Sequence, residues 1–294
     1  MTTRSAAPHA GPSDPYVGHT VGPHPALRAY VSAYVEQALE APPGEGVRVI
    51  QSAHTDPVAC VTWGPGEVRI GVGEGFPIPA LALAGPLPHS FTNTFTGRVR
   101  GFFVRFTPVG PLALLGVAGR RYGTSPRMDD LVDPALAPAV RAWADAVVEA
   151  PDTEARAALT DRLLLDRLPH VPARVAFVER TVARIEATDG LLRIAALAGA
   201  LGVGESTLRR RFREDLGLSA KRFSEVVRFR HAHAFLLTTP EATWADAVHR
   251  FGYADQAHLI RDYGRFAGVS PTRWDPDVRR FDLNFGIAEP RRPG

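Results

Sequence analysis

The sequence predicts an α+β protein in which a β-sandwich or small barrel with an attached helical hairpin precedes an all-α domain. Three observations predict this order: short β-rich runs separated by Gly and Pro, a later change to helical periodicity, and an internal repeat near the C-terminus. The 294 residues suffice for about two domains with cores of their own. The expected boundaries are a mobile arm at 1–24, a β-rich domain at 25–170, a helical domain at 171–280 and a tail at 281–294.

The first part of the chain changes from an arm to a β-rich region. Residues 1–24 are rich in Pro, Gly, His and Ala and show no apolar periodicity, which is typical of a segment that does not fold alone. Between residues 46 and 107, short β-rich runs alternate with turn residues at the regular spacing of a sandwich or barrel. These runs are VRVIQSA, VACVTW, VRIGV, LALAG, SFTNTF and GFFVRFTP.

From residue 134 to 168 the apolar pattern becomes helical, and a turn at Pro151–Thr153 divides it into two amphipathic helices. Two interpretations of this hairpin stay open: it forms a dimer surface, or it covers the sheet. Pro169 and Pro172 mark a short linker, after which we expect a helix at 173–187.

Charge and cysteine content narrow the class of protein. From Arg174 onward the chain has 20 Lys+Arg against 15 Asp+Glu, whereas the preceding residues have 14 against 16, so the basic excess lies in the helical half. The single cysteine, Cys60, excludes an internal disulfide and a CxxC metal site, and its apolar neighbours predict a buried strand residue. No apolar run reaches the length of a membrane helix and no export segment begins the chain, so we expect a cytoplasmic protein without a membrane partner.

The internal repeat has the pattern of two helix-turn-helix motifs. The first copy reads RIAALAGALGVGESTLRRRFREDLGLS, and the second reads TWADAVHRFGYADQAHLIRDYGRFAGVSP. In each copy a glycine, Gly202 or Gly252, supplies the positive φ that ends one helix and turns the chain toward the next. The second helix of each copy is expected at 205–215 and at 256–267.

Each of these second helices presents a polar, cationic face when its apolar i,i+4 pair points to the core. A DNA major groove admits one helix and is read by donors and acceptors on that helix's exposed face. One arginine-bearing helix is more often a solvated surface, but two matched copies favour DNA reading. The base-reading candidates are Ser206, Thr207, Arg209, Arg210, Gln256, His258 and Arg261, and the phosphate-binding candidates are Arg213, Arg222, Arg265 and Arg273. Because the first copy has three consecutive arginines, we expect it to supply more of the affinity.

A long helix predicted at 220–238 separates the two motifs. Its 19 residues span roughly 28 Å, which is comparable with the ~34 Å between successive major-groove segments on one face of DNA. His231 and His233 on this helix lie about 200° apart and cannot share a metal ion there. The sequence therefore predicts a spacer between two reading helices.

These residues resemble a known family. LGV followed by STLRRRF and GLS, and then FGYADQAHLIRDY and GVSPTRW, are similar to the paired helix-turn-helix domain of AraC/XylS-type bacterial transcription regulators, over roughly residues 174–276. A weaker similarity, in HTVGPHPALRAYV and VRFTPVGPLALLGV, implies a cupin-like sensory domain in the N-terminal half. The resemblance implies double-stranded DNA as a partner, a small-molecule effector, a homodimer, and RNA polymerase if the protein is an activator.

The alternative class is an N-terminal ligand-binding or enzymatic module that carries a DNA-binding tail. The N-terminal half has no His-x-His pair, and the chain has no GxSxG or GxxxxGK[ST] motif, so we expect no catalytic residues, no metal and no cofactor. A third interpretation is that the β domain only dimerises. If an effector pocket exists, the candidates for its lining are Trp63, Phe91, Phe102 and Val104, which are otherwise core residues.

Overall fold

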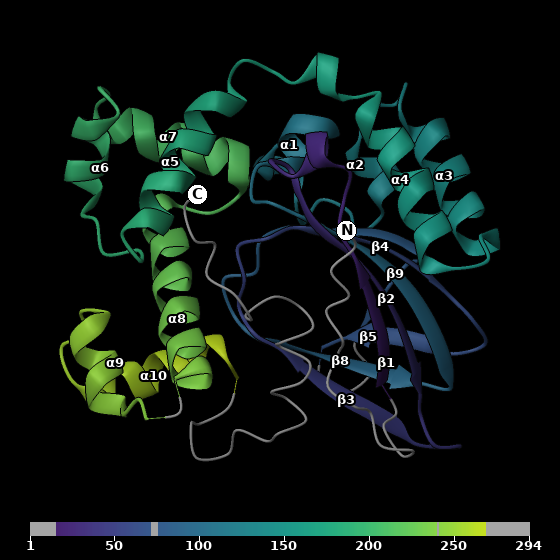
Figure 1. The fold of residues 1–294 in the computed structure, drawn as a ribbon, viewed down its shortest axis with the longest axis horizontal. Helices are drawn as coiled ribbons and strands as arrows, with labels where there is room; N and C mark the ends of the chain where they lie inside the picture. The colour runs from purple at the N-terminus through teal and green to yellow at the C-terminus, as the bar shows by residue number, and fades with distance from the viewer. Residues whose placement is uncertain (1–15, 72–75, 240, 269–294) are drawn as a thin grey trace.

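The computed structural model describes residues 16–71, 76–239 and 241–268 and consists of a β-rich domain followed by a helical domain (Figure 1). The β-rich domain contains two antiparallel sheets, in which strands distant in sequence lie side by side. The first sheet has the order β1 (Tyr16–Val21), β2 (Val31–Glu40), β9 (Arg98–Phe106), β4 (Val58–Trp63) and β7 (Leu81–Ala84). The second has the order β3 (Gly46–Gln51), β8 (Phe91–Thr96), β5 (Glu67–Ile70) and β6 (Phe76–Pro77). The predicted α+β class is confirmed.

Two strands precede the region in which strands were expected. The arm predicted at 1–24 is wrong for residues 16–21, which form β1 and pair along their whole length with β2. The sequence YVGHTV shows no clear alternation of apolar and polar residues, but its backbone hydrogen bonds to β2 do not depend on side-chain type. Residues 1–15 lie outside the described part of the chain.

The first sheet is covered on both faces. Along β2, Gln37 and Leu39 point toward the second sheet, whereas the Tyr34 hydroxyl donates to Asp161 on the opposite face at 2.7 Å. Successive side chains of a strand alternate between faces, so each strand of this sheet contributes to two separate interiors. This double burial explains why the strand's sequence shows no clean alternation of apolar and polar residues.

The helical hairpin consists of α3 (Ala137–Glu149) and α4 (Thr153–Leu165) and packs on the outer face of the first sheet (Figure 1). The Asp152 side chain caps α4 by accepting from the Ala155 backbone N–H at 2.8 Å, as expected for a turn at this position. The hairpin therefore covers the sheet, in agreement with one of the two interpretations. The other interpretation, a dimer surface, stays a prediction.

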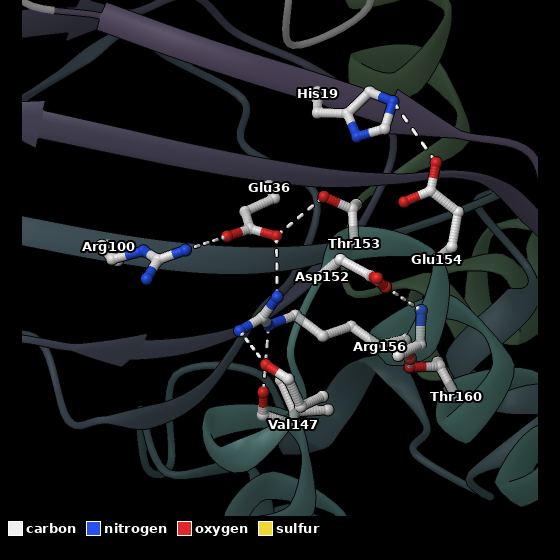
Figure 2. Close-up of polar contacts among 11 residues, drawn as sticks. His19, Glu36, Arg100, Val147, Asp152, Thr153, Glu154, Arg156 and Thr160 are labelled. Carbon is white, nitrogen blue, oxygen red and sulfur yellow. Dashed lines mark hydrogen bonds and ion pairs between the residues drawn. The ribbon is translucent and has the colours of Figure 1, made fainter.

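A buried charged network joins the hairpin to the sheet. Figure 2 shows the Glu36 carboxylate accepting from Arg156 Nη1 at 3.1 Å, from Thr153 Oγ1 at 2.8 Å and from Arg100 Nη2 at 2.7 Å. Arg156 is only 2% exposed, and its Nε also donates to the Val147 carbonyl at 3.0 Å. Removal of one partner from such a network leaves an uncompensated buried charge, so β2 and the start of α4 are expected to move together.

Short helical elements connect the hairpin, the sheet and the helical domain. They are η1 (Pro25–Leu27), α1 (Gly110–Leu114), η2 (Gly119–Arg121), α2 (Met128–Leu131) and η3 (Leu168–His170). The helical domain then contains α5 (Val175–Ala187), α6 (Ile194–Ala200), α7 (Glu205–Leu216), α8 (Ala220–Thr238), α9 (Trp244–Arg250) and α10 (Gln256–Phe266). Figure 1 shows α5, α6 and α7 at one end of α8, with α9 and α10 at the other.

The turns of the two motifs have the geometry that their glycines predict. Gly202 and Gly252 adopt φ values of +67° and +61°, in the left-handed region that a residue with a Cβ rarely occupies. The helix predicted at 205–215 extends one residue further, to Leu216, and the helix predicted at 256–267 ends at Phe266. The long helix occupies the predicted residues 220–238.

Both helix-turn-helix motifs contact the β-rich domain. Near the first motif, η2 packs so closely on the end of α7 that a Cβ at Gly119 would lie 1.8 Å from the backbone nitrogen of Gly217. Near the second motif, the Ala53 backbone N–H donates to the Phe266 carbonyl at the end of α10, at 2.7 Å. Each second helix therefore ends against the N-terminal domain.

Candidate nucleic-acid interface and ligand cavity

The exposed face of α7 carries most of the side chains expected to read DNA in the first motif. Leu208 and Phe212 are fully buried, because their i,i+4 spacing places both toward the core. The opposite face exposes Ser206, Arg209, Arg210 and Arg213, and Thr207 lies half-buried at its edge. The sequence prediction of an outward cationic face is thus reproduced in the structure.

Two of these arginines form ion pairs within α7. Arg209 Nη2 lies 2.7 Å from Glu205 Oε2, and Arg210 Nη1 lies 3.3 Å from Glu214 Oε2. Exposed i,i+4 pairs contribute only about 0.3–0.5 kcal/mol, whereas a bidentate contact to a base contributes about 1–3 kcal/mol. These intrahelical ion pairs are therefore weak enough not to prevent either arginine from contacting another group. Arg211 is directed elsewhere, with its guanidinium 5.2 Å from the centre of the Phe177 ring.

The exposed face of α10 has a different composition. Gln256 and Arg261 are exposed and make no side-chain hydrogen bond or ion pair with any residue that the structure describes. His258 is half-buried against its own helix, with its ring centre 5.1 Å from that of Tyr253 and its Nε2 4.0 Å from Asp262. Gln256 and Arg261 are therefore better placed than His258 to reach a base edge.

One exposed residue on this helix escaped the sequence prediction. Ile260 is 42% exposed and lies one helical turn after Gln256. The sequence could have indicated this residue, because Ile260 is an apolar side chain on the polar face of an amphipathic helix. An aliphatic group in the major groove suits the methyl group of thymine.

The four arginines expected to bind phosphate differ in exposure and in their ion pairs. Arg213 is exposed on α7, whereas Arg273 lies outside the described residues. Arg222 Nη1 and Arg265 Nη1 both approach Glu225 Oε2, at 2.8 and 3.8 Å. Both arginines lie near His89 of the β-rich domain. The pKa of His89 is lowered by the partial burial of its ring and by the positive charges of Arg222 and Arg265. Arg213 is thus the candidate most open to a phosphate.

The histidines of α8 have structural partners. His233 Nδ1 lies 2.7 Å from the Tyr263 hydroxyl, and its ring stacks on Phe229. His231 Nδ1 lies 2.6 Å from Asp189 Oδ1. Among the described residues, no group of three or more His, Cys, Asp or Glu side chains is arranged to hold a metal ion. No helix in the described ranges combines the length and apolar character needed to cross a membrane.

The N-terminal domain contains a cavity between its two sheets. It has a volume of about 50 Å³ and is lined by side chains of β2, β4 and β9 from the first sheet and of β3, β5 and β8 from the second. Among the lining residues are Gln37, Cys60, Asn93 and Phe103. Burial raises the pKa of the Cys60 thiol to about 12, so this thiol is uncharged near neutral pH.

None of the four pocket candidates from the sequence lines this cavity. Phe102 and Val104 lie in the core between the first sheet and the helices, whereas their neighbours Gly101 and Phe103 face the cavity. Trp63 lies on the helix side of β4 with its ring centre 5.1 Å from the Arg156 guanidinium carbon. Phe91 precedes the lining residues of β8. A shift of one residue along a strand changes the face, and the sequence did not identify which interior was hollow.

Comparison with known proteins identifies the helical domain. Residues 197–276 match a family model described as a helix-turn-helix domain. No match was found among curated protein sequences. The chain is similar to the solved structure of ToxT from Vibrio cholerae, with 8% identity, a TM-score of 0.43, and coverage of 78% of this chain and 97% of that one.

Two further solved structures are similar to the chain, with TM-scores of 0.42 and 0.20. ToxT from Vibrio cholerae strain SCE256 bound to an unsaturated fatty acid has 10% identity, a TM-score of 0.42, and coverage of 80% of this chain and 96% of that one. A hydroxyethylphosphonate dioxygenase variant has 13% identity, a TM-score of 0.20, and coverage of 83% and 47%. At these TM-scores the likeness carries no conclusion about ligand or activity.

The matched segment includes α7 and α10, whose exposed faces are described above, and the helix α8 between them. Residues 197–276 therefore form a helix-turn-helix domain, and the protein is a DNA-binding regulator. The match lies within the segment whose motifs resemble the paired helix-turn-helix domain of AraC/XylS-type regulators.

Proposed function

We propose that the protein reads two successive major-groove segments of double-stranded DNA, one with α7 and one with α10, under the control of its N-terminal domain. The observation that supports this most directly is the exposed polar side chains of α7 and α10. These two helices lie at opposite ends of α8 (Figure 1). Arg210 would read bases in the first segment, and Gln256 and Arg261 in the second. Arg213 would bind the phosphate backbone.

Control by the N-terminal domain is supported by its contacts with both reading helices. The end of α7 lies against η2, and the end of α10 accepts a hydrogen bond from Ala53. A third contact joins α8 to the same domain, where Arg230 Nη1 lies 3.0 Å from Thr55 Oγ1 and 3.6 Å from Asp56 Oδ2. A small-molecule effector that shifts the loop at 52–56 or η2 would change the relative placement of the two helices. Dimerisation through the helical hairpin belongs to the same proposal.

Selection of bound fragments from a random DNA pool tests the reading function. We expect a motif with two half-sites about one helical turn apart, or about 10 bp, and weaker binding at raised salt. A variant with Arg210→Ala should recover a motif that is relaxed in one half-site only. If the intact protein recovers no motif, or a motif with a single half-site, the two-segment proposal is wrong.

A further inference from the structure

We propose that two loops of the N-terminal domain position the second reading helix, α10, and leave the first, α7, unaffected. These loops, residues 52–56 and 87–90, form a clasp on the C-terminal end of α10. They are joined to each other, because His54 and Leu87 exchange backbone hydrogen bonds of 2.9 and 2.8 Å. The proposal rests on the proposed function and deepens it, since it assigns the control by the N-terminal domain to one of the two half-sites.

The clasp completes the hydrogen bonding at the end of α10. The last four carbonyls of a helix have no partner within the helix. In α10, the Phe266 carbonyl accepts from the Ala53 N–H at 2.7 Å, and the Arg265 carbonyl accepts from the Ser90 N–H at 3.4 Å. One donor therefore comes from each loop. The last turn of the second reading helix is held by the N-terminal domain as well as by its own helix.

A buried ion-pair cluster anchors the clasp to α8. The Asp56 carboxylate lies between two guanidinium groups, 3.6 Å from Arg230 Nη1 of α8 and 3.7 Å from Arg105 Nη2 of β9. These three side chains are 11–17% exposed. Thr55 Oγ1 also accepts from Arg230 Nη1, at 3.0 Å. Loss of the carboxylate would leave two positive charges close together without it, so Asp56 is expected to hold the clasp in place.

The first reading helix is attached to the N-terminal domain in a different way. Buried apolar residues of the first sheet, the hairpin and α5–α7 form one continuous core, which includes Val117 before η2 and Phe212 of α7. The second motif has a separate core, built on Phe229 of α8 and Tyr263 of α10. Within the described part of the chain, Ala53 is the one residue of the N-terminal domain that belongs to this second core.

This difference makes the clasp the contact that can open. Separation of the first motif from the N-terminal domain would expose apolar area to water, which is unfavourable in proportion to that area. Opening of the clasp would instead exchange backbone hydrogen bonds for hydrogen bonds to water, and the net loss for each bond is small. It would free the last turn of α10, where the Phe266 ring lies 5.2 Å from the Phe229 ring of α8. The placement of α10 on α8 therefore depends on the clasp.

Hydrogen exchange on the full-length protein tests whether the clasp orders α10. Thr55→Val and Asp56→Asn keep the shape of the side chain and weaken the anchor to α8. We expect each to raise amide exchange at residues 263–267 by roughly three- to tenfold and to leave residues 213–217 at the end of α7 unchanged. Asp56→Glu keeps the charge and should stay close to the intact protein. The control is Asp145→Asn, which removes an exposed carboxylate of α3 and should change neither segment.

DNA binding of the same variants tests whether the clasp positions α10 for reading. The probes are DNA with both half-sites and DNA with the half-site of α7 alone. A loosened α10 must be ordered when it binds, so we expect Thr55→Val and Asp56→Asn to lose roughly three- to tenfold in affinity for the first DNA. Their affinity for the second DNA should change by less than about twofold, because α7 stays in the continuous core. Asp56→Glu should restore the preference for two half-sites.

Three results would overturn the proposal. They are unchanged exchange at residues 263–267, an equal rise at residues 213–217, and a loss of affinity that is the same for both DNAs. Tighter binding of the clasp variants to DNA with both half-sites would also overturn it, because the clasp would then inhibit reading. If Asp56→Asn does not fold, Thr55→Val decides the outcome. If the intact protein shows no preference for two half-sites, the proposed function fails, and the exchange measurement still decides whether the clasp orders α10.

Discussion

At the residue scale, the exposed arginines of α7 differ in what they are expected to contact. Arg210 projects from the middle of the exposed face, whereas Arg213 lies one turn nearer the C-terminal end of the helix. In a helix that enters the major groove with its N-terminal part, base edges meet the earlier residues and phosphates meet the later ones. The two positions therefore form a matched pair for mutation.

Arg210→Ala should weaken binding to the preferred DNA by about 1–3 kcal/mol and relax the preference at one base. Arg213→Ala should weaken binding to all sequences nearly equally and reduce the salt slope by about one. Titration of both variants against the preferred site and single-base variants of it distinguishes these roles. Uniform weakening by Arg210→Ala would show that this residue binds phosphate instead.

Ile260 adds a different kind of contact to the second reading helix. Its aliphatic side chain is 42% exposed on α10, one turn after Gln256 and next to Arg261 in the sequence. Burial of one methyl group contributes about 0.8 kcal/mol. If a thymine methyl packs against Ile260, removal of either the methyl group or the Ile260 side chain should weaken DNA binding measurably.

We expect a thymine-to-deoxyuridine exchange at one position of the second half-site to weaken binding of the intact protein by about 0.8 kcal/mol. The Ile260→Ala variant should bind both DNAs alike, because the partner of the methyl group has been removed. Val148→Ala, at another exposed apolar position on α3, is the control and should retain the difference. Equal binding of the two DNAs by the intact protein at every thymine of the half-site would exclude the contact.

At the element scale, the contact between η2 and α7 is close enough to exclude any side chain at one position. A Cβ at Gly119 would lie 1.8 Å from the backbone nitrogen of Gly217, the C-cap residue of α7, so the two backbones would have to separate. Gly22, by contrast, has nothing within 4 Å of an added Cβ. Replacement by alanine should therefore disturb the structure at Gly119 and leave it unchanged at Gly22.

Gly119→Ala should lower the free energy of unfolding by about 1–3 kcal/mol and separate η2 from α7. Amide hydrogen exchange at residues 119–122 and 216–217 should rise, and the preference for DNA with two half-sites over one should fall. Gly22→Ala should leave all three quantities unchanged. Unaltered exchange in Gly119→Ala would mean that this contact does not hold the domains together.

At the scale of the whole molecule, the contact of the 52–56 loop with α8 contains a histidine that responds to pH. Burial, followed by the positive charge of Arg230, lowers the pKa of His54 to about 4, although the nearby Asp56 opposes this shift. His54 Nδ1 is buried and has no hydrogen-bond partner among the residues that the structure describes. The neutral ring is therefore the form that the folded protein accepts.

Because the pKa of His54 is lower in the folded chain than in the unfolded one, stability is unaffected above about pH 6.5 and falls as the pH decreases toward 4. The loss should be on the order of 3 kcal/mol. Denaturant unfolding of the intact protein and of His54→Leu across this range should show a smaller loss in the variant. His249→Leu, at an exposed position, should follow the intact protein. Parallel pH profiles for His54→Leu and the intact protein would contradict the assignment.

The sequence by itself determined the elements whose formation depends on local interactions. Gly202 and Gly252 end their helices because of their own backbone freedom, and the i,i+4 pairs of α7 and α10 fix which faces point outward. The hairpin turn follows from the Asp152 cap in the same way. These signals lie within a few residues of one another, so no knowledge of the fold was needed to interpret them.

Only the tertiary structure decided which face of each strand lines the cavity and what the N-terminal domain contacts. Phe102 and Phe103 are adjacent and similar in sequence, yet one is in the core beneath the helices and the other faces the cavity. A sheet buried on both faces has no polar side to mark its orientation, so its sequence does not distinguish the two interiors. The contacts of Gly119 and Ala53 with the ends of α7 and α10 join segments distant in the chain, and such pairings arise only from the packing of the complete molecule.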